Sequence, residues 1–356
     1  MDRGLFDPAA SDQSHRPCNL VTGALGFVGL HLVHKLLLAG HPVVGVGRLE
    51  PGAGPPERVG AFRFDGTSAS LTGAVRYVGP AGRFWFIPCA LEDPAPIAEL
   101  VGTLGLSMIY HLAAQSSAGL SFTNPIDTLD SNLNGTLNLL EAVRRLPDAE
   151  RPVILSVGSG EEYGPQPEDS YPLTEAAPLN PVSPYGVSKT AQTLLCRQYV
   201  RSWDLPIIVV RSFSHTGPGH DPRFAFPAFA RQIAAAEAGQ GPSEIVTGDL
   251  SVVRDFLDVR DVVEAYRLLT KEGTPGEIYN VSSGTPLTIR EGLEILASGA
   301  TCPISVRTDP ALCRPSDTPL MVGDSSKLRK DTGWVPEWQI SDTLSDLLAA
   351  ARKEYS

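Results

Sequence analysis

The stretch CNLVTGALGFVGLHLVHKLLLAGHPVVGVGR, residues 18–48, decides the fold. It has the pattern of a short apolar strand, a glycine turn, an amphipathic helix and a second apolar strand. Gly23, Gly26 and Gly29 are spaced GxxGxxG, and not GxGxxG as in the commoner dinucleotide fingerprint. Such glycines permit a tight turn and let a pyrophosphate approach the N-terminus of the helix, which is expected to begin near Phe27. The alternative is that they only tighten a turn between strand and helix.

The end of the second strand in this stretch carries a clue to the cofactor. A carboxylate at that point would bind the ribose 2'-hydroxyl of NAD. The chain has Gly47 and Arg48 instead, and no carboxylate before Glu50. An arginine here can pair with the 2'-phosphate of NADP, so the sequence favours NADP(H) and leaves NAD(H) open. Arg48 as an ordinary surface residue is the alternative.

Apolar strands and helical patterns alternate downstream. RFWFIPCALED, SMIYHLAAQSS, PVILSVGSGEEYG and PIIVVRSFSHTGPG have the pattern of strands. The alternation predicts an α/β fold, a doubly wound parallel sheet of the Rossmann type, with a smaller mixed α/β C-terminal substrate domain. The expected organisation is a flexible tail over 1–18, a dinucleotide-binding domain over 19–214 to which a strand and helix near 253–271 return, and a substrate domain over 215–252 and 272–356.

Two regions depart from this alternation. Residues 49–85 are rich in Gly and Pro, and AFRFDG and AVRYVG within them predict the short strands of a hairpin, for which the sequence indicates no function. From His215 on, PRFAFPAFARQIAAAEAG predicts a helix and VVRDFLDVRDVVEAYRLLTKEG a strand followed by a helix. DSSKLRKDTGW and ISDTLSDLLAAARKEY predict the last helices.

Composition excludes several classes of protein. The 356 residues carry a net charge of −11 without a run of Lys or Arg, which argues against nucleic acid or an anionic membrane as partner. The five scattered cysteines indicate reduced thiols, and neither they nor the seven histidines have the spacing of metal ligands, so no metal is expected. No apolar stretch approaches the roughly 18 residues of a membrane span, and the first residues lack the pattern of a signal peptide. A cytoplasmic protein is expected.

Acid–base chemistry is expected between residues 159 and 189. Among the nine tyrosines, only Tyr185 has a lysine, Lys189, four positions on, and a helix would place both on one face. A nearby ammonium lowers the pKa of a phenol, which would make Tyr185 an acid/base for a sugar or alcohol oxygen. Ser159 and Glu161 follow a predicted strand, at the sheet edge where ligands bind in open α/β folds. A solvated helix face is the alternative.

Two further features suit a nucleotide ligand. The small residues of the HLAAQSS loop would let the nicotinamide-side ribose lie against the backbone. Arg254 and Arg314 lie at predicted strand or loop edges, where guanidinium groups suit a diphosphate. Each arginine is equally well explained as an ordinary ion-pairing residue.

Over nearly the whole chain from Leu20, these motifs resemble a known family. The glycine motif, HLAAQ, SPYGVSK and RDFLDVRDV are similar to those of the extended short-chain dehydrogenases/reductases, the NAD-dependent epimerase/dehydratase family, which act on nucleotide sugars. GSGEEYG, RSFSHTGPG and DPALCRPSD look most like the branch that reduces GDP-4-keto-6-deoxy-D-mannose with NADPH to GDP-D-rhamnose. The alternatives within the family are a GDP-mannose 4,6-dehydratase and another nucleotide-sugar 4-epimerase or dehydratase.

The resemblance implies a role for each matching residue. Tyr185 would donate the proton to the C4 oxygen, Lys189 would tune Tyr185 and hold the nicotinamide ribose, and Ser159 would bind the sugar carbonyl. A homodimer is expected through helices at 134–145 and 185–203. The implied cofactor-binding residues are Gly23, Gly26, Phe27, Val28, Arg48, Leu91, Leu112, Ala113, Ala114, Tyr185 and Lys189. The implied substrate-binding residues, for which a GDP-sugar is favoured, are Ser116, Ser159, Glu161, Ser214, Arg254, Arg314 and Asp317, and Asn132 would kink a helix or position a water.

The chain departs from the family pattern at three places. Ala90 and Leu91 stand where the family usually has an aspartate that touches adenine. Ser214 replaces an asparagine that contacts the substrate diphosphate in many members. Glu161 occupies the place where dehydratases keep the base that removes the C5 proton, and a reductase has no chemical need of it.

Overall fold

The structure is a computed structural model that describes residues 18–49, 54–67, 73–313 and 318–355. Packing groups the chain into two units. Unit one contains the residues up to Gly158, Ser188–Val210 and Tyr266–Ile278, and unit two contains Ser159–Val187, Arg211–Ala265 and the residues from Tyr279 on. The predicted domains divide the chain differently, because they place residues 159–187 and 253–265 with the dinucleotide-binding part, whereas both ranges belong to unit two. All but the last residue of the predicted tail 1–18 lie outside the described residues.

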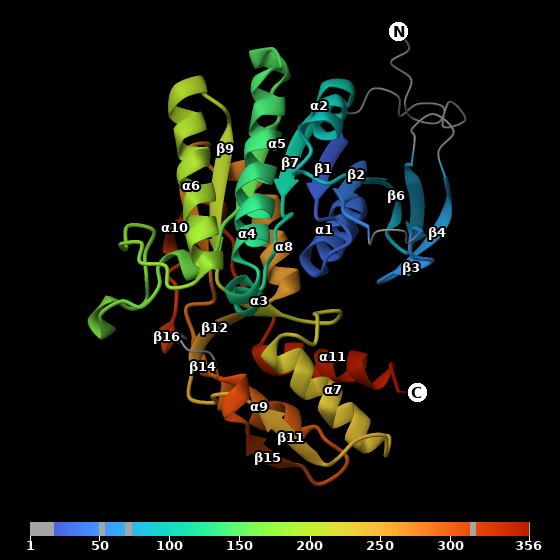
Figure 1. Ribbon diagram of the computed structural model, residues 1–356, viewed down its shortest axis with the longest axis vertical. Coiled ribbons are helices and arrows are strands. Elements are labelled where there is room, and N and C mark those ends of the chain that lie inside the picture. The colour runs from blue at the N-terminus through green and yellow to red at the C-terminus, as the bar shows by residue number, and fades with distance from the viewer. Residues whose placement is uncertain (1–17, 50–53, 68–72, 314–317, 356) are drawn as a thin grey trace. The chain divides into compact units, whose positions relative to one another are not determined.

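The largest sheet has ten strands in the order β13-β9-β8-β7-β1-β2-β6-β5-β4-β3, and most of it belongs to unit one (Figure 1). From β9 to β6, every neighbouring pair of strands is parallel. These strands are β1 (Cys18–Thr22), β2 (Val43–Gly47), β6 (Gly82–Pro88), β7 (Leu106–His111), β8 (Val153–Val157) and β9 (Ile207–Ser212), and β13 (Ile278–Val281) lies beyond β9.

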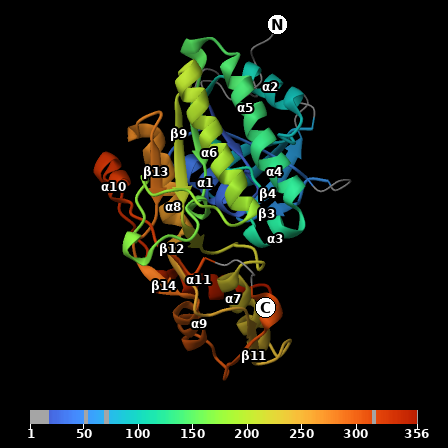
Figure 2. The same cartoon turned by 60° about the vertical axis from the view of Figure 1, so that its left-hand side comes forward.

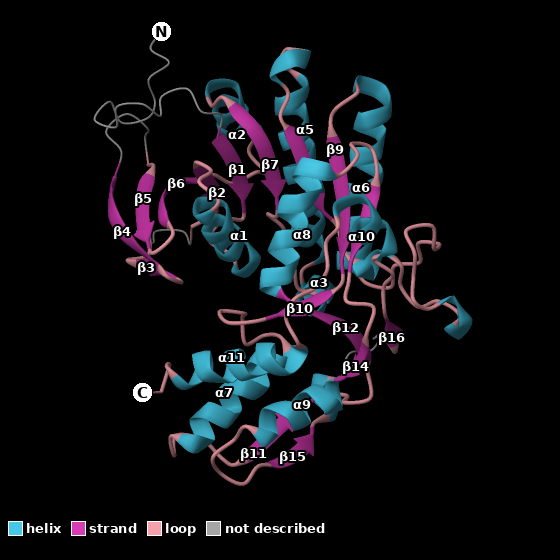
Figure 3. Ribbon diagram, turned by 180° about the vertical axis from the view of Figure 1, so that it is seen from behind, coloured by secondary structure: helices cyan, strands magenta, loops and turns pink. Residues whose placement is uncertain are grey.

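Helices cover both faces of this parallel sheet. Buried side chains of α2, α5 and α6 form one core with the strands. On the opposite face, seen from behind in Figure 3, lie α1 and the end of α8, where Thr270 Oγ1 is 2.9 Å from the Tyr110 hydroxyl of β7. The helices are α1 (Phe27–Leu38), α2 (Pro94–Thr103), α5 (Gly135–Arg144), α6 (Pro184–Trp203) and α8 (Val259–Glu272). The predicted doubly wound α/β fold is confirmed.

Beyond β6, the sheet continues as an antiparallel extension. It consists of β3 (Arg58–Val59), β4 (Phe62–Thr67) and β5 (Val75–Gly79), each antiparallel to its neighbour. One face of the extension is aromatic, because Phe84 of β6 makes an edge contact with Phe62 and stacks on Tyr77, with ring centroids 5.1 and 5.5 Å away. The strands predicted in AFRFDG and AVRYVG are therefore confirmed, and they extend the main sheet.

The helix predicted at residues 134–145 is preceded by an irregular helical segment. α3 (Ala118–Thr123) and α4 (Pro125–Leu129) lead into a π-helical turn (Asp130–Asn134), and α5 follows it. The wider turn accommodates the Asn132 side chain, which is fully buried. Its Oδ1 accepts the Gln115 backbone N–H at 2.7 Å, and its Nδ2 donates to Ser188 Oγ at 2.8 Å. The Asn132 side chain thus links the HLAAQ loop to α6.

Unit two has its own core. β12 (Val253–Asp258) pairs with β10 (Ser214–Thr216), β14 (Pro286–Thr288) and β16 (Leu320–Met321), and β11 (Glu244–Thr247) pairs with β15 (Ser305–Thr308). Buried residues of α7 (Ala225–Glu237), α9 (Ile289–Ser298) and α11 (Ile340–Arg352) form the core, and Figure 2 shows these helices together. The chain also forms α10 (Ser326–Thr332) and 3-10 turns at Asp148–Glu150, Gly160–Glu162, Glu168–Ser170 and Pro310–Leu312. The helices predicted near the C-terminus are present.

Candidate functional site

The glycine turn after β1 has the backbone geometry of a pyrophosphate cradle. Gly23 has φ +69°, which L side chains rarely adopt, and a Cβ built on it would lie 3.0 Å from the Ala113 backbone nitrogen. Gly26 is the N-cap of α1 and provides no side-chain cap. The first turn of α1, with Phe27 and Val28, therefore presents its N-terminus without a capping side chain in front of it. These residues fit a dinucleotide.

A cavity of about 200 Å³ adjoins this turn in unit one. The structure brings five of the predicted cofactor residues together there: Gly23, Arg48, Leu91, Ala113 and Ala114. The sequence reasoning missed Gly47, Cys89, Glu92 and Ser131, which also line it. Cys89 and Glu92 closely follow β6, so the ends of the parallel strands were the signal that could have identified them.

One end of the cavity carries both a cation and a carboxylate. Arg48 Nη1 lies 3.2 Å from Glu92 Oε1, and the two side chains are 60% and 23% exposed. An ion pair this exposed contributes little to stability and can open for a ligand. Arg48 could then meet a 2'-phosphate, whereas Glu92 could accept a hydrogen bond from a 2'-hydroxyl.

Hydrogen bonds to residues of unit one fix the Lys189 side chain. It is almost fully buried, and its Nζ donates to the Val157 carbonyl at 2.8 Å and to Gln192 Oε1 at 2.9 Å. Gln192 Nε2 donates in turn to Ser156 Oγ at 2.9 Å. The end of β8 and the third residue after Lys189 therefore fix the ammonium. Sequence reasoning did not identify Gln192, although its position one helical turn after Lys189 was visible.

His111, at the end of β7, is also buried in unit one. Its Nδ1 lies 2.9 Å from Thr22 Oγ1, and its Nε2 lies 2.9 Å from Thr136 Oγ1. Burial, assisted by the charge of Lys189, lowers the pKa of His111 to about 3. The imidazole is therefore neutral at physiological pH and serves as a hydrogen-bonding link between β1 and the helix that begins at Gly135.

In unit two, the structure brings Ser159, Glu161 and Tyr185 together. The Ser159 and Tyr185 side chains form a hydrogen bond, and the Glu161 backbone N–H donates to Ser159 Oγ at 3.1 Å. Tyr185 lies in the first turn of α6. A hydroxyl pair of this kind can bind a carbonyl oxygen and deliver a proton to it.

The prediction that Lys189 lowers the pKa of Tyr185 is wrong for this structure. Burial raises that pKa well above its usual value, and the charges of Glu161 and Glu162 raise it further, while the hydrogen bond from Ser159 lowers it. A phenolate in a low-dielectric site beside two carboxylates is costly. Tyr185 is therefore protonated at neutral pH.

A buried ion pair supports the turn that carries Ser159. Glu162 Oε1 accepts the Ser159 backbone N–H at 2.9 Å, and its Oε2 accepts from Arg211 Nε at 3.0 Å. Arg211 Nη1 also donates to the Tyr163 hydroxyl at 3.1 Å, and that hydroxyl donates to Asn280 Oδ1 at 2.7 Å. Glu162 is fully buried and Arg211 nearly so. Sequence reasoning missed this pair, for which the second glutamate of GSGEEYG was the available sign.

The other predicted substrate-binding residues lie in different secondary-structure elements. Ser116 is exposed in the loop before α3, and Ser214 begins β10. Arg254, in β12, is 8% exposed and donates through Nη1 to the Val253 and Thr318 carbonyls at 2.9 and 2.6 Å. Arg314 and Asp317 lie outside the described residues.

The described part of the chain has neither a cluster of metal ligands nor a membrane-spanning helix. No group of three or more His, Cys, Asp or Glu residues there could hold a metal ion. No described helix is long and apolar enough to cross a membrane. Burial raises the thiol pKa of both Cys18 and Cys89 to about 11, so neither is a nucleophile at neutral pH.

A glycine turn after the first strand of a parallel sheet and the hydrogen-bonded pair of Ser159 and Tyr185 are typical of the extended short-chain dehydrogenase/reductase class of enzymes. The family model described as GDP-mannose 4,6 dehydratase matches residues 20–347. The chain belongs to this family.

Individual relatives agree with this assignment. The chain is 38% identical over 259 residues to GDP-6-deoxy-D-mannose reductase of Pseudomonas aeruginosa, covering 73% of this chain and 84% of the relative. It is similar to the structure of RMD from Pseudomonas aeruginosa complexed with NADPH, at 31% identity and TM-score 0.75, covering 95% and 99% of the two chains. It is also similar to the Thermus thermophilus UDP-glucose 4-epimerase complex with NAD, at 28% identity and TM-score 0.77, covering 94% and 98%. These relatives support an enzyme with a nicotinamide cofactor.

Proposed function

We propose that the chain reduces the 4-keto group of a GDP-4-keto-6-deoxy-hexose with NADPH, forming GDP-D-rhamnose. The observation that carries this proposal is the pair of hydroxyl groups of Tyr185 and Ser159, whose side chains are hydrogen-bonded to each other. A ketone reduction needs a proton donor at the carbonyl oxygen, and this pair of hydroxyl groups can provide it. The 38% identity to a GDP-6-deoxy-D-mannose reductase supports the same choice.

The residues of the chain supply the proton and the positioning. When bound, the nicotinamide cofactor supplies the hydride that C4 accepts. Ser159 donates a hydrogen bond to the carbonyl oxygen, and Tyr185 transfers its proton to that oxygen as the C=O bond becomes C–OH. Lys189, which the Val157 carbonyl and Gln192 hold in place, would bind the ribose hydroxyls of the cofactor.

The preference for NADPH rests on Arg48 at the cofactor cavity. A 2'-phosphate would replace Glu92 as the partner of its guanidinium. We expect Arg48→Gln to raise the Kd for NADPH about tenfold, the loss of one charge-assisted hydrogen bond, and to leave the Kd for NADH unchanged. Fluorescence titration of both cofactors measures this, and an equal effect on the two would contradict a role for Arg48 in selection.

The direct test mixes the chain with NADPH and GDP-4-keto-6-deoxymannose. We expect loss of NADPH absorbance in a one-to-one ratio with a 4-hydroxy product, identified by mass and nuclear magnetic resonance spectra. UDP-, dTDP- and CDP-linked keto sugars are the controls for the nucleotide. Absence of NADPH oxidation with the GDP sugar would overturn the proposal.

A second candidate, a GDP-mannose 4,6-dehydratase, is favoured by Glu161. Its backbone N–H donates to Ser159 Oγ, so its side chain starts from the same turn as the proposed proton donor site. A carboxylate there could remove the C5 proton of a 4-keto intermediate. This activity would convert GDP-mannose to a 4-keto sugar without net cofactor change, and Glu161→Gln would abolish it. Turnover that survives the substitution would show that Glu161 is not the base.

The assembly is also a proposal. Helices in residues 134–145 and 185–203 would pair in a homodimer, by analogy with the family. Light scattering at micromolar concentration would give the mass of the assembly, and a monomer would contradict the expectation.

A further inference from the structure

A row of arginines crosses the antiparallel extension of the main sheet. The strand register pairs Arg58 of β3 with Arg63 of β4, Arg63 with Val78 of β5, and Val78 with Arg83 of β6. Residues directly opposite one another in a sheet project to the same face. Arg58, Arg63 and Arg83 therefore share one face, in line across four strands.

The aromatic packing of the other face fixes this arrangement. Phe62, Tyr77 and Phe84 alternate with the row along the same strands and are nearly or fully buried. A slip of one residue would move these rings to the arginine face and the arginines into the core. The row is thus a fixed property of the extension.

The row has an unbalanced charge. Like charges directly opposite one another in a sheet are destabilising. On the same face Arg76 is neutralised by Asp65, with Nε and Oδ2 2.9 Å apart. Among the residues that the structure describes, no carboxylate forms an ion pair with Arg58, Arg63 or Arg83. In a chain of net charge −11, this local excess of cations is an exception.

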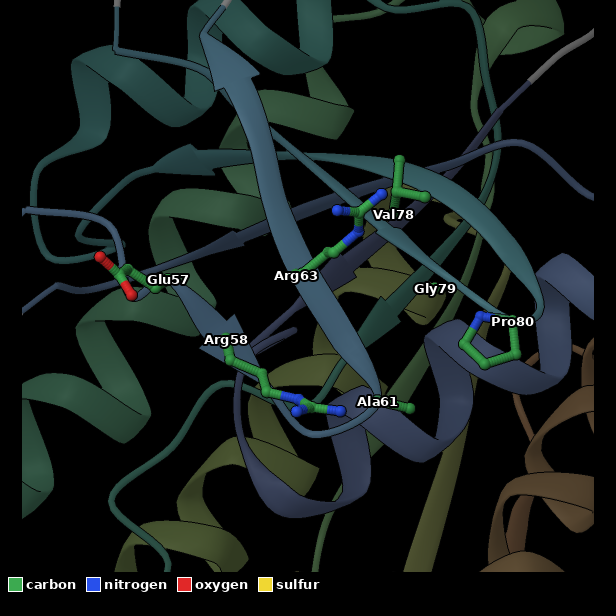
Figure 4. Close-up of a pocket in the computed structure, with 7 residues that line it drawn as sticks. All are labelled: Glu57, Arg58, Ala61, Arg63, Val78, Gly79 and Pro80. Atoms are coloured by element: carbon green, nitrogen blue, oxygen red, sulfur yellow. The ribbon is translucent and has the colours of Figure 1, made fainter.

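A cavity of about 450 Å³ opens on the row. Arg58, Arg63 and Glu57 all line it, and in Figure 4 the Arg58 guanidinium extends toward Ala61, the Arg63 guanidinium lies next to Val78, and the Glu57 carboxylate lies apart from both. Neighbouring strands are about 4.8 Å apart, so Arg58 and Arg63 can grip one phosphoryl group, and Arg83, two strands from Arg63, can reach a second. Guanidinium groups match phosphate oxygens in pairs.

We propose that this face binds a small ligand with at least two phosphoryl groups. A small anion senses only charges within about one Debye length of 8–10 Å, whereas a nucleic acid or a membrane would meet the acidic remainder of the chain. The site is separate from the cofactor cavity, because β6 runs from Arg83 to the residues before Cys89, about 20 Å at 3.3 Å per residue.

Calorimetric titration of the whole chain with inorganic pyrophosphate, in saturating NADPH to fill the cofactor cavity, tests the proposal. We expect one site, with Kd raised about tenfold by Arg63→Gln and binding lost in Arg58→Gln/Arg63→Gln. Glu57→Gln removes a carboxylate that lines the cavity and should tighten binding. Arg201→Gln, an exposed arginine at the end of α6, is the matched control and should change nothing.

The outcomes separate the proposal from its alternatives. No heat from wild type, or equal binding by Arg63→Gln, would overturn it. Binding lost in Arg48→Gln but kept in the double variant would place pyrophosphate in the cofactor cavity and would also overturn it. Removing like charges should not lower the melting temperature, so thermal unfolding of Arg63→Gln checks that the fold is retained.

Discussion

Two turns that follow parallel strands of the main sheet are built in opposite ways. The turn after β1 uses glycines, and its shape comes from the backbone, with Gly23 at φ +69°. The turn after β8 uses side chains, and Glu162 and Arg211 hold it from within. The turn after β1 leaves room for a ligand because its glycines have no side chains. In the turn after β8, the buried Glu162–Arg211 ion pair positions Ser159. The turn after β1 is therefore sensitive to substitution of Gly23 itself, whereas the turn after β8 depends on Arg211, a residue distant in the sequence.

The largest effect is expected at Tyr185, which is hydrogen-bonded to Ser159 in the turn after β8. We expect Tyr185→Phe to lower kcat for ketone reduction about a thousandfold, because the proton donor is lost. Cofactor affinity, which depends mainly on the glycine turn, should change far less. Stopped-flow absorbance and cofactor titration measure the two quantities, with Tyr355→Phe as the control for loss of a phenol. A Tyr185→Phe variant within tenfold of wild type would remove Tyr185 from the mechanism.

Breaking the buried pair comes next. Arg211→Met leaves the Glu162 carboxylate buried without its cation, and we expect the free energy of unfolding in urea to fall by about 3–5 kcal/mol. Arg211→Met/Glu162→Leu should recover much of this stability, because no charge remains buried.

The double variant distinguishes positioning from stability. In the double variant the Ser159 N–H has lost its acceptor, the Glu162 carboxylate. We therefore expect kcat to be lower than in wild type, while KM changes little. Full recovery of both stability and kcat would show that Glu162 does not position Ser159.

A titrating group, His111, lies beside the glycine turn, because its Nδ1 contacts the hydroxyl of Thr22 at the end of β1. Its pKa is about 3 in the folded chain and about 6.5 in the unfolded chain, so the unfolded state binds more protons between these values. Its contribution to stability is complete above pH 6.5 and decreases as the pH falls, by about 2 kcal/mol between pH 7 and pH 5.

Urea titrations across this pH range test the assignment. His111→Gln should flatten the dependence of stability on pH, and His41→Gln, at an exposed position, should leave it as in wild type. Equal slopes for wild type and His111→Gln would assign the dependence to other groups.

The smallest effect is expected at Gly23. Gly23→Ala forces a Cβ into the left-handed region, at about 1–2 kcal/mol, and against the Ala113 backbone, so the Kd of the cofactor should rise about tenfold. Gly40→Ala is the matched control, because Gly40 has φ +77° and no atom within 4 Å of the added Cβ. If both variants lose the same cofactor affinity, strain and not the close approach is responsible.

The elements of the main sheet were predictable from the sequence because their signals are local. The strand, turn and helix of residues 18–48 appear as β1, the glycine turn, α1 and β2, and the hairpin strands near 62–79 also appear. The interruption at Asn132 was not visible as a π-helical turn, because its partners, Gln115 and Ser188, come from distant segments. The grouping of 159–187 with unit two likewise depends on long-range packing.

The site was predictable in part for the same reason. Gly23, Arg48 and Ala113 meet at one cavity, as the positions after successive parallel strands require. The direction of the Tyr185 pKa was predicted wrongly, because a lysine one turn away is visible in the sequence and burial is not. Glu92, Gln192 and Glu162 were missed because their partners, Arg48, Ser156 and Arg211, come from distant segments of the chain.

By itself, the sequence determined the doubly wound fold and the glycine turn, since periodicity and spacing are properties of neighbouring residues. Only the tertiary structure decided the direction in which the pKa of Tyr185 shifts, the burial of the Glu162–Arg211 pair and the alignment of three arginines across four strands. Solvation and register are set by residues far apart in the chain, and electrostatic free energies depend on both.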